Sequence, residues 1–166
     1  MKQASTTDMH DLPLRGSTAV EMLVNDHEVI KSLLEELTSA TSAAQCKRVF
    51  ERLKAVLTVH NATEENLVYP AIAIDAGKKA DSEHLYHETA AADMLVFELD
   101  ALLRDGDTAA FATKAKKLQT AILEHIDVEE SSAFPKLEKH TDPARAAALA
   151  ASVRKFRHEL HMGSAS

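Results

Sequence analysis

The sequence predicts an all-α protein: an antiparallel, up-down-up-down four-helix bundle followed by a short extra C-terminal helix. The composition is dominated by residues that favour helix, chiefly Ala, Leu, Glu and Lys, with only four Gly and four Pro in 166 residues. Apolar residues recur every three or four positions along four long segments, which is the spacing of amphipathic helices. Short polar turns separate these segments, as in bundles whose successive helices pack side by side.

The first helix follows a polar N-terminal segment. Residues 1–16 are predicted to form a flexible arm. Ser17 or Thr18 can cap the helix, with Glu21 placed to complete a capping box. The helical spacing of apolar residues then continues to about Ser39, where a run of small polar residues predicts a turn.

The second helix begins near Ala43, and Pro70 should kink or stop it. A turn follows at residues 75–77. The third helix is expected over about residues 80–104. It ends where Gly106 is available for a left-handed conformation.

The fourth helix is expected over about residues 108–135. A fifth, shorter helix should run to about His161, with Asp142 as its cap and Pro143 at its first position. The chain therefore divides into the arm, a bundle over residues 17–140 and a C-terminal helix and tail over 141–166.

Charge and cysteine content restrict the partners and the compartment. The net charge of −7 argues against nucleic acid or an anionic membrane as a partner, since both favour a basic face. The single cysteine, Cys46, cannot form an intramolecular disulfide. No apolar run approaches the roughly 18 residues of a membrane span, and the first residues lack the apolar stretch of a secretory signal. We therefore expect a cytoplasmic protein.

One sequence motif, the repeated phrase, occurs twice in the chain, and its two copies start 65 residues apart. His60 is followed four residues later by Glu64, and His125 is followed four residues later by Glu129. Both copies continue to an aromatic residue and a proline: Tyr69-Pro70 and Phe134-Pro135. A His and a Glu at this spacing lie one turn apart on the same side of a helix. Two such helices facing each other can hold two imidazoles and two carboxylates around a common point.

The other two long helices each add a histidine to the predicted apolar face. These are His27 in the first helix and His87 in the third, and His84 also suits the core-facing side of the third helix. His84 is either a fifth imidazole ligand or a residue that supports another ligand. A buried carboxylate must be paired, neutralised or bound to metal, and Lys and Arg are nearly absent from these faces.

One shared metal site accounts for these histidines and glutamates together better than a separate role for each residue. A lone histidine on an apolar face is usually a hydrogen-bonded core residue, and a single His-x-x-x-Glu is usually a solvated pair. Imidazole and carboxylate without thiolate suit iron, manganese or zinc. Six or more ligands exceed one tetrahedral zinc site and suit two iron ions with both carboxylates bridging, so zinc or manganese is the lesser expectation.

The order His27, His60 with Glu64, His87, and His125 with Glu129 resembles the hemerythrin-like family, the HHE cation-binding domain. The resemblance implies a four-helix bundle holding two irons joined by an oxo or hydroxo group. It also implies that Glu64 and Glu129 bridge the irons while the histidines are terminal ligands.

The family's oxygen carriers place an Asp five residues after the last His. Here that position is Glu130, which points away from the predicted core face.

Three functions compete on this evidence. The leading interpretation is a non-haem di-iron protein that binds or senses O2, nitric oxide or iron, since the site is rich in histidine. The alternative is a di-iron enzyme acting on peroxide or ferrous iron, which needs only a spare coordination position. A metal-free phosphotransfer bundle is disfavoured, because such domains expose one reactive histidine whereas these histidines form a buried set.

Overall fold

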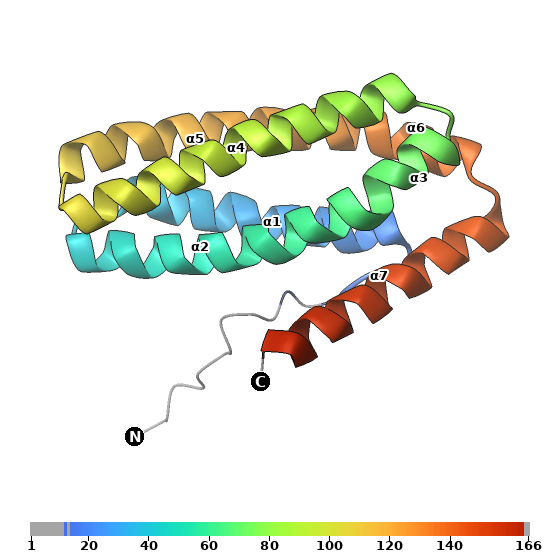
Figure 1. Ribbon diagram of the computed structural model, residues 1–166, viewed down its shortest axis with the longest axis horizontal. Helices are drawn as coiled ribbons and strands as arrows, with labels where there is room; N and C mark the ends of the chain where they lie inside the picture. The colour runs from blue at the N-terminus through green and yellow to red at the C-terminus, as the bar shows by residue number, and fades with distance from the viewer. Residues whose placement is uncertain (1–11, 13, 165–166) are drawn as a thin grey trace.

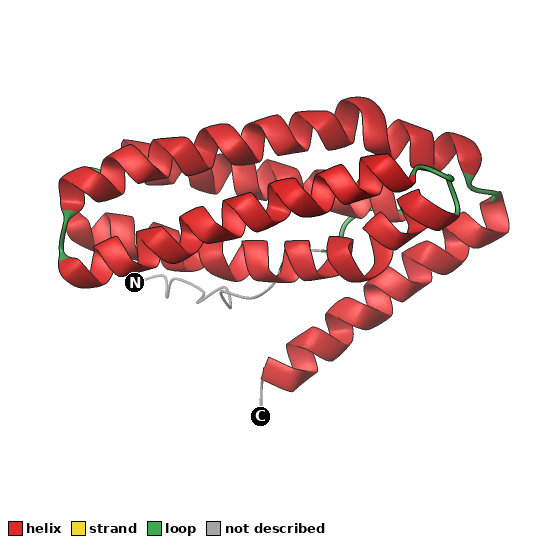
Figure 2. Ribbon diagram, turned by 45° about the horizontal axis from the view of Figure 1, so that its top comes forward, coloured by secondary structure: helices red, strands yellow, loops and turns green. Residues whose placement is uncertain are grey.

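The computed structural model describes residue 12 and residues 14–164, with side-chain burial given up to residue 161. Most of the predicted flexible arm, residues 1–11 and 13, lies outside the described residues. Helices account for nearly all of the described chain and no strand occurs among its residues, which confirms the prediction of an all-helical bundle (Figures 1 and 2). We find no helix in this part of the chain with the length and apolar content that crossing a membrane requires.

The first helical pair is α1 (Ala19–Ser39) and α2 (Ala43–Thr63). The predicted capping box is present: the Glu21 amide donates to Thr18 Oγ1 at 3.1 Å, and the Thr18 amide donates to Glu21 Oε2 at 3.2 Å. Ser42 caps α2 by accepting a hydrogen bond from the Gln45 amide. The two helices pack side by side along the bundle (Figure 1).

The second pair is α4 (Lys79–Asp105) and α5 (Thr108–Val128), which form the most extensive helix contact in the described chain. Gly106 ends α4 with φ of +74°, a left-handed conformation that favours glycine, as the sequence predicted. Asp107 then caps α5 by accepting a hydrogen bond from the Ala110 amide.

Two π-helical turns interrupt the long helices and were not predicted. They are η1 (Glu64–Val68) and η2 (Glu129–Ala133), each starting at the glutamate of the repeated phrase. The helices α3 (Tyr69–Ile74) and α6 (Phe134–His140) continue from them with Pro70 and Pro135 in their first turns. Each π turn adds one residue to the helical repeat and so changes the face that the following residue presents. Single π turns are frequent at functional sites.

The last helix, α7 (Pro143–Ser164), packs across α1, α2 and η1 rather than extending the bundle (Figures 1 and 2). Its predicted cap is present, since Asp142 Oδ1 accepts a hydrogen bond from the Arg145 amide at 2.9 Å. Leu149 and Val153 are buried in the bundle's core, and so is the charged side chain of Arg157. At 22 residues α7 is longer than the short helix that the sequence suggested.

Two apolar clusters make up the core, one toward each end of the bundle. One contains Met22, Tyr69 and Phe134, and the other contains Leu34 and Leu118. Along α1, from α2 into η1 and from α5 into η2, the switch from one cluster to the other coincides with buried polar residues: Asp26, His27, His60, Thr63, Glu64, His125 and Glu129. The bundle therefore buries a polar layer between two apolar ones.

Candidate metal centre

Three histidines from three helices enter the polar layer with their rings held in the same manner. In each ring Nδ1 lies within hydrogen-bonding distance of a carboxylate oxygen: His27 to Glu130 at 2.8 Å, His60 to Asp26 at 3.2 Å, and His125 to Glu88 at 2.9 Å. A carboxylate accepts hydrogen bonds, so Nδ1 carries the proton and Nε2 of the neutral ring carries a lone pair. This is the arrangement that orients histidines toward metal ions.

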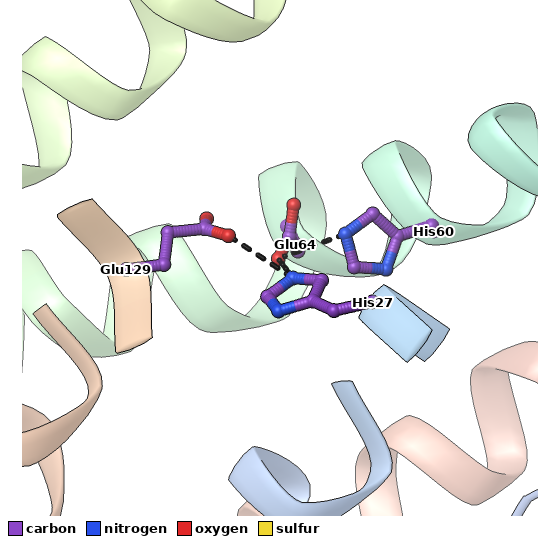
Figure 3. A group of neighbouring side chains, drawn as sticks. All are labelled: His27, His60, Glu64 and Glu129. Carbon is purple, nitrogen blue, oxygen red and sulfur yellow. Dashed lines mark ion pairs between the residues drawn. The ribbon is translucent and has the colours of Figure 1, made fainter. Parts of the chain in front are cut away.

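Donor atoms without hydrogen-bond partners converge at one side of the layer. His27 Nε2, Glu64 Oε1 and Glu129 Oε2 are buried and have no hydrogen-bond partner. His60 completes the group, in which one ligand atom from each residue lies within 4.8 Å of the others (Figure 3). Buried polar atoms normally have hydrogen-bond partners, so three neighbouring atoms without them mark a place where a cation could bind.

The distances within this group are short, although His27 Nε2, Glu64 Oε1 and Glu129 Oε2 form no hydrogen bond. His27 Nε2 lies 3.2 Å from Glu129 Oε2 and 3.9 Å from Glu64 Oε1, and His60 Nε2 lies 3.3 Å from Glu64 Oε1 (Figure 3). The two glutamates come from different helical pairs, one at the end of α2 and one at the end of α5.

The other oxygens of the same glutamates face a second group of donors. His125 Nε2 lies 3.2 Å from Glu129 Oε1. The buried hydroxyl of Tyr69 lies 3.0 Å from Glu64 Oε2, 3.0 Å from Glu129 Oε1 and 3.1 Å from His125 Nε2. Thr89 Oγ1 is also 3.0 Å from this hydroxyl. Each glutamate thus spans both halves of the layer.

The field in the layer favours positive charge. Burial lowers the pKa of His27, but the carboxylates of Glu129 and Glu64 outweigh it and raise the pKa to about 10. For His125 burial is again opposed, chiefly by Glu129, and the pKa rises to about 9. Burial raises the pKa of Glu129, but His125 and His27 more than offset this and hold its carboxyl well below its usual range. The same carboxylates that hold protons on these rings would attract a metal cation.

A buried ion pair ties α7 to this layer. Arg157 donates from Nη1 to Asp26 Oδ1 at 3.1 Å, from Nη2 to Asp26 Oδ2, and from Nε to Thr63 Oγ1 at 3.1 Å. Burial raises the pKa of Asp26, but its hydrogen bonds with His60 and Arg157 outweigh burial and lower the pKa. Arg157 therefore keeps Asp26 ionised, and Asp26 in turn fixes the ring of His60.

Five of the seven residues predicted as ligands come together: His27, His60, Glu64, His125 and Glu129. Their coordination of a metal stays a prediction.

The placement of His84 and His87 on the core face was wrong, because both side chains are exposed. The buried face of α4 is formed instead by Ser82, Leu85, Thr89 and Ala92. At about 100° per residue, His84 lies about 100° and His87 about 160° around the helix from Leu85, so both point away from the buried face. His84 Nε2 lies 3.1 Å from Glu88 Oε1, so it contacts the carboxylate that holds His125 rather than the centre itself.

Sequence reasoning missed four groups that shape the layer: Asp26, Tyr69, Glu88 and Arg157. Tyr69 was given no role in the predicted site, although its place in the repeated phrase was a usable signal. Asp26 directly precedes His27 but acts on His60, a pairing of distant segments that no local spacing reveals. Glu130, which was expected to point away from the core, does leave the centre but contacts His27 Nδ1.

A small cavity adjoins the two halves of the layer. Its volume is about 20 Å³, which is slightly more than the roughly 10–15 Å³ that one water needs. Its lining combines the polar residues His60, Asn61, Thr89, Asp93 and His125 with the apolar residues Ile30, Leu57, Ala92, Ile122 and Ile126.

The donor set fits a transition-metal centre. Imidazole nitrogens and carboxylate oxygens suit iron, manganese or zinc, and no thiolate contributes among the described residues. The unpartnered Nε2 and Oε atoms are the observation that makes this group a candidate cation site.

Two comparisons with known proteins bear on this chain, and the family match agrees with a cation site. The family described as "Hemerythrin HHE cation binding domain" matches residues 18–137, which is most of the chain. A protein named DNA nickase from Nostoc sp. (strain PCC 7120 / SAG 25.82 / UTEX 2576) is 25% identical over 109 residues. That alignment covers 66% of this chain but only 30% of the nickase, so the chain corresponds to less than a third of that protein.

Proposed function

The chain belongs to the hemerythrin HHE cation-binding domain family, and we propose that it is a non-haem di-iron protein that binds or senses O2 or nitric oxide. The observation that carries this proposal is the paired orientation of the histidines. Three rings have Nδ1 held by carboxylates and direct Nε2 toward two shared glutamates. Iron held by histidines and carboxylates can bind a small diatomic molecule at an open coordination position.

The arrangement of the bundle supports binding rather than turnover of large substrates. If the helices alternate up and down, as their short turns predict, both His-x-x-x-Glu pairs reach the layer at the same depth. Glu64 and Glu129 are fully buried and the apolar clusters above and below exclude bulk water. A cavity that adjoins both His60 and His125 holds about 20 Å³, which suits a diatomic molecule.

The outer residues give the centre its rigidity. Glu130, Asp26 and Glu88 each hold one ring, so the nitrogens need little reorganisation when a cation arrives. Preorganised ligands raise affinity because less conformational entropy is lost on binding.

Metal analysis and optical spectroscopy test the proposal. Protein loaded with ferrous iron under nitrogen should retain stoichiometric iron after gel filtration and develop a charge-transfer band on exposure to O2, with a distinct spectrum in nitric oxide. Glu64→Ala should lose the iron and the band. Glu65→Ala, which alters the neighbouring and partly exposed carboxylate, should keep both.

Wild-type protein that retains no iron would refute the proposal. Iron-loaded protein that ignores O2 and nitric oxide but releases O2 catalytically from peroxide would move the function to the enzyme class.

A further inference from the structure

We propose that Tyr69 is itself a metal ligand, whose phenolic oxygen completes the second half of the centre where the sequence had suggested His87. This inference rests on the proposed function and names a residue of the same centre. It assigns one ion to His27 and His60 and the other to His125 and Tyr69, with Glu64 and Glu129 shared between them.

The separations of the four donor atoms support this assignment. Tyr69 Oη lies 3.0 Å from Glu64 Oε2, 3.0 Å from Glu129 Oε1 and 3.1 Å from His125 Nε2. His125 Nε2 lies 3.2 Å from Glu129 Oε1. Adjacent ligands of an octahedral ion with bonds of about 2.1 Å stand about 3.0 Å apart. The hydroxyl therefore already has the spacing of a neighbouring ligand to three other donors.

The Tyr69 hydroxyl faces more carboxylate oxygens than it can donate to. It has one proton, whereas Glu64 Oε2 and Glu129 Oε1 each lie 3.0 Å from it. Thr89 can donate its own hydroxyl proton to Tyr69 but supplies nothing to the two carboxylates. A cation bound in place of the phenolic proton interacts favourably with both glutamates at once, and the displaced proton leaves to solvent.

The position of Tyr69 follows from the π turn and from the composition of α4. The turn η1 places Tyr69 five residues after Glu64, so that its ring returns to the layer with complete burial. The buried face of α4 offers Thr89 and Ala92 at this level and no imidazole.

The two copies of the repeated phrase differ at the position that Tyr69 occupies in the first and Phe134 in the second. In the other half, Phe134 stacks on His27 with ring centroids 5.8 Å apart and has no oxygen to offer, but His27 itself supplies the donor. Each half then has two terminal donors and two glutamate oxygens.

The chain contains only two tyrosines, which makes the test sharp. Tyr86 is the matched control, since its ring packs 4.9 Å from that of Tyr69 while its hydroxyl donates to the Glu65 carbonyl instead. Ferric-loaded wild type should show a visible tyrosinate-to-iron absorption band, and resonance Raman excitation in that band should enhance tyrosinate ring modes. Tyr69→Phe should lose the band and these modes, and Tyr86→Phe should keep them.

Iron content is measured on the same samples, so the two proposals fail separately. Wild type that retains iron but shows no tyrosinate modes overturns the assignment of Tyr69 and leaves the proposed function standing, and wild type without iron overturns both. Ring-deuterated tyrosine in wild-type protein provides a second measurement that does not depend on the folding of a variant. The enhanced modes must shift to lower frequency, and modes that do not shift also overturn the assignment.

Discussion

Replacing Arg157 by methionine should destabilise the protein strongly, although Arg157 lies outside the segment that matches the family. Its guanidinium forms a bidentate pair with Asp26 and a third hydrogen bond to Thr63, all buried. Methionine keeps much of the side-chain volume but leaves the Asp26 carboxylate buried with His60 as its remaining partner.

The expected loss follows from the cost of an uncompensated buried charge. Removing one member of a buried ion pair costs about 3–5 kcal/mol, far more than the pair is worth relative to apolar residues. For a domain of this size each kcal/mol corresponds to roughly 2–4 °C, so the midpoint of thermal unfolding should fall by roughly 6–20 °C. Adding Asp26→Asn should recover a large part of the loss, because the second change removes the stranded charge.

Urea unfolding of metal-free protein measures these free energies, with a constant slope as evidence that the unfolded states are comparable. Lys155→Met is the matched control on the same helix, since its side chain is 78% exposed. A loss below about 1 kcal/mol for Arg157→Met, or an equal loss for Lys155→Met, would show that the buried pair does not hold α7 in place.

Three further predictions concern the centre. Glu88→Gln should weaken metal binding about 10–100-fold, measured by competition with a chromophoric chelator, because His125 loses the carboxylate that orients it; an unchanged affinity would contradict that role. His87→Ala should leave iron content unchanged in metal analysis, since this side chain is exposed, whereas loss of iron would restore His87 as a ligand. The raised pKa values of His27, about 10, and His125, about 9, give metal-free protein a stabilising contribution that is fully present below the unfolded value of 6.5. Urea unfolding should show this stability falling as pH rises from 6.5 through about 10, and a rising stability over that range would refute the assignment.

Local sequence was sufficient to predict those features whose physical cause lies within a few residues, such as helix caps. The capping box at Thr18, the left-handed Gly106 and the cap at Asp142 each depend on groups within a few residues of one another. The spacing of His60 to Glu64 likewise follows from the helical repeat alone, and both residues lie where the spacing predicts.

The errors on α4 have a physical origin. Its apolar face is weakly marked, because alanine is abundant and large apolar residues such as Met94 and Phe97 are exposed. Periodicity therefore could not distinguish the face that carries Leu85 and Thr89 from the faces that carry His84 and His87.

The sequence by itself determined the helical class and the paired histidines and carboxylates. The helical repeat sets which neighbouring residues share a face, and a carboxylate on a buried face needs a partner. Only the tertiary structure decided which groups fill the remaining places around the centre. Tyr69 reaches His125 across 56 positions in the chain, and Arg157 reaches Asp26 across 131. Such contacts depend on how helices pack and where a π turn shifts the repeat, and no local pattern encodes either.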